Sequence, residues 1–190
     1  MNHLIVFAHP NNESLNSTLL YALEMHLKRQ DHTVKTRNLY ELKFDPVLSL
    51  SDMQGQRIGQ VAEEVALEQD FIRWADCITF IHPIWWTGLP AIFKGYIDRV
   101  FSYGFAYCYE AGKQHGLLSG KQAVVINTHG KSQPEYQAIG MDKALALTSD
   151  VGIYNYCGMA LKRHLYFDNA DRATRDTIEQ WINHIESVFA

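Results

Sequence analysis

Apolar and polar positions follow one another along the chain in blocks that predict strands and helices in turn. Short apolar runs such as 4–8 and 77–82 contain no turn residue, which is typical of parallel strands buried on both faces. Other segments place apolar residues at helical spacing, as Leu19, Leu23 and Leu27 do. The pattern predicts strands at 4–8, 33–38, 77–82, 123–127 and 159–167, and helices from 14 or 16 to 29 and at 56–74, 90–101, 142–150 and 173–189.

This order of elements predicts an α/β fold. Strands that alternate with helices are joined by right-handed crossovers and form a parallel sheet with helices on both faces. Five strands suit a doubly wound sheet of order 2-1-3-4-5, in which the loops after the first and third strands flank one crevice. No repeat, low-complexity tract or linker divides the sequence, so we expect a single domain over residues 1–190.

Two adjacent indoles, Trp85 and Trp86, lie in a loop bounded by Pro83 and Pro90. The loop follows the predicted strand at 77–82, and ligands of open α/β sheets bind beyond the carboxyl ends of the strands. The loop therefore favours a site for a flat ligand. Trp85 taken alone could equally pack on the following helix.

Two further loops are predicted at the same edge of the sheet. The loop after the first strand lacks both G-x-G-x-x-G and the P-loop motif, but it places Ser14 and Asn16 at a helix start, where free backbone N–H groups can receive a phosphate. Plain helix capping is the alternative for these two residues. The fourth strand ends in Thr128-His129-Gly130. A phosphorylated flat ring system fits all three loops, and flavin mononucleotide (FMN) has that anatomy.

Composition excludes several other classes of function. The net charge of −4, from 17 basic and 21 acidic residues, offers no basic stripe for nucleic acid. The three cysteines form no C-x-x-C pair and the nine histidines form no i, i+4 pair, so we expect no disulfide framework and no metal site. The first residues hold no charged leader and no apolar stretch long enough to span a bilayer, so a soluble cytoplasmic protein is expected.

The sequence resembles the NAD(P)H:quinone oxidoreductases of flavodoxin-like fold, which include DT-diaphorase and shorter bacterial relatives. The resemblance covers the chain almost end to end. It rests on Ala8-His9-Pro10 with Ser14 and Asn16, Leu39-Tyr40 with Phe44-Asp45-Pro46, Pro83-Ile84-Trp85-Trp86 with 90–95, Asp98-Arg99-Val100-Phe101, and Gly104-Phe105-Ala106-Tyr107.

The resemblance implies a flavin site built from the same three loops. It places His9, Ser14, Leu15 and Asn16 at the phosphate and ribityl chain; Pro83, Ile84, Trp86 and Thr87 at the isoalloxazine; and Thr128, His129 and Gly130 also at the flavin. Trp86, not Trp85, is the counterpart of the family's flavin-contacting indole. The family's usual Thr-Thr-Gly-Gly is here Asn127-Thr128-His129-Gly130, a departure that leaves the role of His129 open.

The resemblance also implies catalytic and substrate-pocket residues. Tyr136 fits a family tyrosine that assists hydride transfer, whereas the histidine that accompanies it has no equivalent in 138–142. His129 either replaces that histidine from the other side of the ring or only hydrogen-bonds backbone. Tyr107, Tyr109 and Tyr156 match aromatic residues of the substrate pocket, the first two contributed by the partner subunit, so a homodimer is implied. Ordinary rim packing is the alternative for each tyrosine.

The expected function is two-electron, ping-pong reduction of quinones or similar flat acceptors by NADH or NADPH through a bound flavin. FMN is favoured over FAD, and azo dyes and nitroaromatics remain possible acceptors. One alternative is a flavin-binding ancillary or regulatory subunit of a potassium-efflux system. Another is a one-electron flavodoxin carrier, for which a net charge of −4 is too small.

Overall fold

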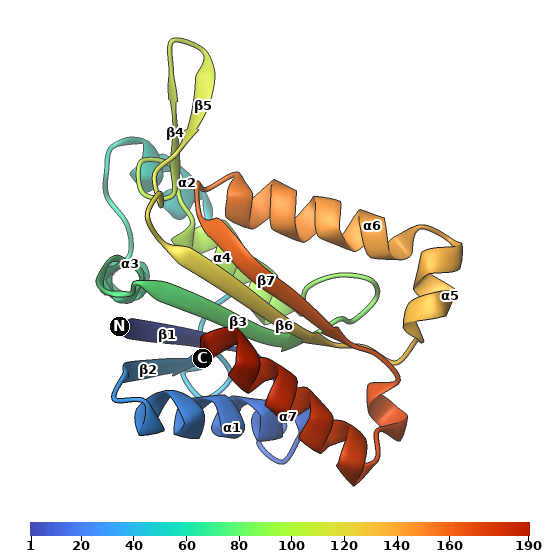
Figure 1. Ribbon diagram of the computed structural model, residues 1–190. Coiled ribbons are helices and arrows are strands. Elements are labelled where there is room, and N and C mark those ends of the chain that lie inside the picture. The colour runs from blue at the N-terminus through green and yellow to red at the C-terminus, as the bar shows by residue number, and fades with distance from the viewer.

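The computed structural model describes residues 1–190 as a parallel sheet between two layers of helices (Figure 1). The strands are β1 Asn2–Phe7, β2 Thr33–Asn38, β3 Cys77–Pro83, β4 Tyr107–Glu110, β5 Lys113–Gly116, β6 Gln122–Thr128 and β7 Ala160–Phe167. The helices are α1 Leu15–Arg29, α2 Leu50–Arg57, α3 Glu63–Trp74, α4 Ala91–Val100, α5 Gln133–Ala138, α6 Met141–Ala146, the π-helix η1 Leu147–Asn155, the 3₁₀-helix η2 Ala170–Arg172 and α7 Arg175–Phe189.

The main sheet has the predicted doubly wound order, β2-β1-β3-β6-β7, with all pairs parallel. Its register pairs Phe7 with Ile81 and Pro83 with Thr128, so β1, β3 and β6 end at neighbouring positions. The loops that follow these three strands therefore begin at one edge of the sheet. The flavodoxin-like order that the sequence predicted is confirmed.

Each face of the sheet is buried by its own set of helices. On one face Ile5, Phe7 and Ile126 pack against leucines of α1 and against Ile185 of α7. On the other face Phe80 and Val125 belong to a cluster that includes residues of α3, α4 and η1. Burial on both sides explains why these strands are continuous apolar runs rather than alternating ones. No helix of the fold has both the length and the apolar character needed to cross a membrane.

The single helix predicted over 56–74 is wrong, because the chain forms α2 and α3 there. Ser49 caps α2 in a capping box with Asp52, so the helix begins at Leu50, six residues before the predicted position. Gly59 then adopts a φ of +71°, a left-handed conformation that ends helices and that glycine takes without steric cost. Apolar residues keep their helical spacing on both sides of this break, so the sequence pattern predicts one continuous helix.

The excursion over 103–120 contains a hairpin that the apolar pattern did not predict. Strands β4 and β5 pair antiparallel around Ala111 and Gly112, which both have positive φ as a two-residue hairpin turn requires. The hairpin projects away from the main sheet (Figure 1). Its first strand carries Tyr107, which packs against the core, and Tyr109, which is exposed.

Two helical segments near the fourth loop also differ from the prediction. The polar stretch after Gly130 forms α5, because Ser132 and Glu135 make a capping box and Pro134 lies in the first turn. The helix predicted at 142–150 begins as α6 and continues as the π-helix η1 to Asn155. π-Helical geometry is rare and is frequently found at functional sites.

Candidate functional site

A cavity of about 280 Å³ lies where β1, β3 and β6 end. All three predicted loops contribute to it, together with a fourth segment after β7. It is lined by His9, Ser14, Leu15, Asn16, Pro83, Ile84, Trp85, Thr128, His129, Gly130, Ala170 and Asp171. Nine of the eleven residues predicted to bind the cofactor are therefore brought together, and the two exceptions are Trp86 and Thr87.

The start of α1 forms one wall of this cavity. Ser14 is the N-cap and accepts a hydrogen bond from the backbone N–H of Ser17. The first turn contains no acidic residue, and the N–H groups of Leu15 and Asn16 have no acceptor within the helix. The positive end of the helix dipole thus faces the cavity beside free donors, which suits an anion such as a phosphate.

The loop after β3 is held in a strained two-residue turn. Trp85 and Gly88 exchange both backbone hydrogen bonds at 3.1 Å, which leaves Trp86 and Thr87 at the tip with φ of +50° and +57°. Such turns normally hold asparagine or glycine, and strained backbone of this kind is concentrated at functional sites. The turn directs the indole of Trp86 fully into solvent, whereas Trp85 lines the cavity. Flavin contacts by Trp86 and Thr87 therefore stay predictions.

The loop after β6 supplies buried polar groups to the cavity. Thr128 donates to the Oδ1 atom of Asn16 at 2.8 Å, and this leaves the Nδ2 atom of Asn16 without a partner. Both ring nitrogens of His129 also lack partners, although only 3% of the residue is exposed. Buried polar atoms are almost always hydrogen-bonded in proteins, so these atoms indicate a polar ligand. The hydroxyls and ring heteroatoms of a flavin would meet that need.

The two predicted catalytic residues lie in contact with each other. The rings of His129 and Tyr136 stack with centroids 4.9 Å apart and planes 8° apart. Burial lowers the pKa of His129, so its imidazole is neutral at neutral pH. His129 reaches the cavity directly, and Tyr136 packs beside Ile84 and Leu145.

Ala170 and Asp171 in η2 are cavity residues that the sequence did not indicate. They lie in a polar turn between the last strand and the last helix, where no spacing or motif marks them. The turn is positioned because the backbone N–H of Ala170 donates to the carbonyl of His129 at 3.0 Å. Tertiary contacts of this kind bring the segment to the cavity; the backbone N–H of His129 likewise donates to the carbonyl of Phe167 at 3.0 Å.

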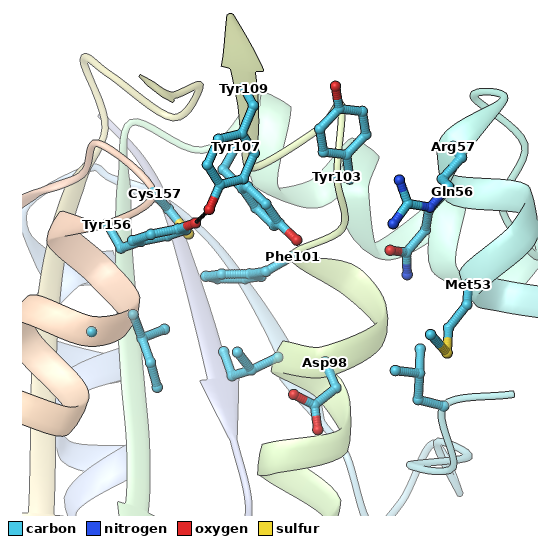
Figure 2. A pocket seen from close by; sticks show the side chains of 14 residues that line it. Met53, Gln56, Arg57, Asp98, Phe101, Tyr103, Tyr107, Tyr109, Tyr156 and Cys157 are labelled. Carbon is cyan, nitrogen blue, oxygen red and sulfur yellow. Dashed lines mark hydrogen bonds between the residues drawn. The ribbon is translucent and has the colours of Figure 1, made fainter. Parts of the chain in front are cut away.

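The three predicted substrate-pocket tyrosines meet in a different cavity of about 500 Å³ (Figure 2). The hydroxyls of Tyr109 and Tyr156 are 3.0 Å apart, and the rings of Tyr107 and Tyr156 meet edge to face at 5.4 Å. The hydrogen bond between the two hydroxyls raises the pKa of Tyr156 to about 12, which keeps that phenol neutral. This aromatic pocket shares no lining residue with the cavity at the strand ends.

Comparison with known proteins identifies the family. The sequence matches the flavodoxin-like fold family over residues 1–188. The chain belongs to this family. It is 43% identical over 160 residues to a Haemophilus influenzae protein named as an uncharacterized NAD(P)H oxidoreductase, with 84% of this chain and 79% of that protein covered. It is 31% identical to the NAD(P)H dehydrogenase [quinone] 1 of Cavia porcellus, with 82% of this chain and 64% of that protein covered.

Solved structures place the chain in the same group. The crystal structure of a Streptococcus mutans protein is 33% identical, with a TM-score of 0.87 over 99% of this chain and 98% of that one. The NAD(P)H:quinone oxidoreductase of Methanothermobacter marburgensis is 26% identical, with a TM-score of 0.85 over 98% of this chain and 94% of that one. The resemblance to the NAD(P)H:quinone oxidoreductase family is thereby confirmed. These relatives give no support to an ancillary subunit of a potassium-efflux system.

Proposed function

We propose that the protein is a flavin-dependent oxidoreductase that uses NADH or NADPH to reduce quinones or similar flat acceptors by two electrons in a ping-pong cycle. The observation that carries this proposal is the cavity at the strand ends, where a free helix start, the tryptophan loop and the unpartnered atoms of Asn16 and His129 converge. Its relatives include proteins named as NAD(P)H oxidoreductases and quinone dehydrogenases.

The residues of the cavity suit the separate parts of FMN. The N–H groups at the start of α1 would hold the phosphate, and Asn16 and Thr128 would meet the ribityl hydroxyls. The loops after β3 and β6 would border the ring. When bound, the flavin supplies the hydride chemistry, while the protein orients it and excludes water. We favour FMN over FAD because one phosphate accounts for the single helix start.

His129 would act on the ring as a neutral hydrogen-bonding group. Its lowered pKa means that it is uncharged at neutral pH, and its ring position is fixed by the stack on Tyr136. One of its nitrogens can then donate to the flavin without adding a charge. In this proposal His129 takes the role of the family histidine that has no equivalent in residues 138–142.

We further propose a homodimer in which each aromatic pocket covers the flavin of its partner. Within one protomer the pocket of Tyr107, Tyr109 and Tyr156 is separate from the cavity at the strand ends. Large apolar side chains beside the pocket, such as Met53 and Leu50 on α2, are exposed and would gain by being covered. A second copy could therefore bring the two half-sites together.

The decisive experiment is the visible spectrum of the purified protein, followed by mass measurement of the released cofactor and by NADH and NADPH oxidation with menadione. We expect a yellow protein that releases FMN and turns over. Asn16→Ala should weaken FMN binding, and Asn183→Ala on the exposed side of α7 is the matched control. A colourless protein that binds neither added FMN nor added FAD would overturn the proposal. Sedimentation velocity tests the dimer.

A further inference from the structure

The aromatic pocket is bordered on one side by helix α2, whose side chains differ from those of the other walls. The hairpin, the end of α4 and η1 supply mainly aromatic and aliphatic side chains. Helix α2 supplies two polar ones, Gln56 and Arg57, beside Met53. Figure 2 shows the guanidinium of Arg57 pointing from α2 toward the tyrosines, with the amide of Gln56 beside it. A cationic group thus lies at a pocket that otherwise suits a flat apolar ring.

Arg57 is the charged side chain of this pocket that has no ionic partner. The other charged side chain is Asp98, whose Oδ1 atom pairs with Nζ of Lys94 at 2.5 Å. The guanidinium of Arg57 forms no salt bridge within the chain. Because a guanidinium is not deprotonated in proteins, this positive charge is permanent.

The ionic contacts of α2 with the rest of the fold are made by a different arginine. Asp52 is the one acidic residue of α2, and its carboxylate accepts from Arg99 at 3.2 and 3.3 Å. Glu64, at the start of α3, pairs with the same arginine at 2.5 Å. Arg99 is buried, whereas Arg57 is exposed and lies outside this network. The charge of Arg57 is therefore available to a ligand.

The pocket combines two kinds of recognition. The rings of Tyr107 and Tyr156 offer aromatic surface on which a flat ring can pack. The planar fork of an arginine matches the two oxygens of a carboxylate or sulfonate. Tyr156 stays neutral because its pKa is raised to about 12, so no phenolate is present to repel an anion. The volume of about 500 Å³ lies within the range of about 300–1,000 Å³ that is typical of small-molecule sites.

We propose that Arg57 makes the aromatic pocket selective for flat aromatic acceptors that carry a carboxylate or sulfonate group. The proposal rests on the proposed function, in which this pocket holds the acceptor, and it names the class of acceptor that is favoured. The ring would lie among the tyrosines, and the anionic group would accept hydrogen bonds from Arg57. A neutral quinone would occupy the same pocket without that contact. Because Arg57 is exposed, we expect a gain of about two- to fivefold in affinity, as for an ion pair in contact with solvent.

A purely structural role for Arg57 leads to a different expectation. The residue lies in the last turn of α2, where a positive charge stabilises the helix dipole. Loss of that effect would weaken the helix in the same way for every ligand, whether charged or neutral. The test must therefore compare ligands that differ only in charge.

The first measurement is calorimetric titration of the flavin-free protein with naphthalenesulfonate and with the corresponding sulfonamide. The two compounds share one ring system and nearly the same shape, but only the sulfonate carries a negative charge. The wild type should bind the sulfonate about two- to fivefold more tightly, and added salt should reduce this preference because it screens exposed charges. Arg57→Gln should lose the preference, and Arg57→Lys should keep most of it because the charge is retained.

The matched control is Arg163→Gln, which removes an exposed arginine on β7 that forms no salt bridge and lines none of the cavities described above. It changes the net charge by the same amount as Arg57→Gln and should keep the full preference. Equal affinities of the wild type for the two compounds would overturn the inference. So would a preference for the sulfonate that persists in Arg57→Gln.

The second measurement compares turnover of a charged and a neutral acceptor. The value of kcat/KM is determined for anthraquinone sulfonate and for menadione, each with NADH. The ratio of the two values should fall by about two- to fivefold in Arg57→Gln and stay at the wild-type value in Arg163→Gln. An unchanged ratio in Arg57→Gln, or a change confined to the KM for NADH, would overturn the inference. If the wild type reduces no acceptor, the proposed function fails, and the calorimetric comparison still decides whether Arg57 selects anions.

Discussion

The hydrogen bond from Thr128 to Asn16 offers a direct test of how the cavity is preorganised. Both residues are at least 96% buried, and the bond of 2.8 Å joins β6 to the start of α1. Thr128→Val keeps the shape of the side chain but removes the donor, so Oδ1 of Asn16 loses its partner. A buried acceptor left unsatisfied costs about 1–3 kcal/mol of unfolding free energy. Thr128→Ser keeps the donor and loses one methyl group, which costs about 0.8 kcal/mol.

Urea unfolding of the flavin-free protein measures the change in stability, and FMN titration measures the change in FMN affinity. We expect Thr128→Val to be less stable than Thr128→Ser and to bind FMN several-fold more weakly, because Asn16 is no longer held with its Nδ2 atom free for the ligand. Equal stabilities of the two variants would refute the role of the bond in folding. Equal FMN affinities would refute its role in presenting Asn16.

Three other predictions concern the rest of the molecule. Burial lowers the pKa values of His3 and His82 to about 4, so the folded state resists their protonation. The free energy of unfolding should therefore fall by up to about 3 kcal/mol for each histidine as the pH drops from about 6.5 to about 4. A urea midpoint that does not change with pH over this range would contradict this. Tyr109→Phe removes the bond that raises the pKa of Tyr156, so ultraviolet titration should show this phenol ionising closer to its ordinary value. Trp86→Gly relieves a φ of +50° at a fully exposed side chain and should stabilise the fold by about 1 kcal/mol. The same change should weaken FMN binding by roughly 0.5–1.5 kcal/mol, because an aromatic contact is lost. Unchanged FMN affinity would show that Trp86 does not contact the flavin.

The main sheet was predictable because its strands are buried on both faces, and such burial leaves a local signature in the sequence. Residues 33–38 form β2 over the predicted range, and the loops after β1, β3 and β6 meet as expected. The break at Gly59 was missed because apolar spacing continues on both sides of it. A glycine within a helical pattern ends the helix when its φ is positive, as at Gly59, and the sequence does not show the sign of φ.

The parts of the site that could not be predicted depend on contacts between distant residues. Asn127, Asp150 and His164 come together from separate elements, and no spacing in the sequence joins them. The choice between Trp85 and Trp86 depends on the sign of φ in a two-residue turn. The residues at its tip, Trp86 and Thr87, are not the asparagine or glycine that normally mark such a turn in a sequence. The direction of the two indoles could therefore not be predicted from the sequence.

Ile153, on the π-helix η1, lines both the aromatic pocket and a third cavity, of about 300 Å³, which His164 also lines. Ile84 likewise lines both this third cavity and the cavity at the strand ends. The third cavity thus shares one isoleucine with each of the other two cavities. An inhibitor anchored among the tyrosines could be extended past Ile153 toward the polar side chains of Asn127 and His164, which line the third cavity. Selectivity among related reductases could therefore be sought in the third cavity instead of in the aromatic pocket.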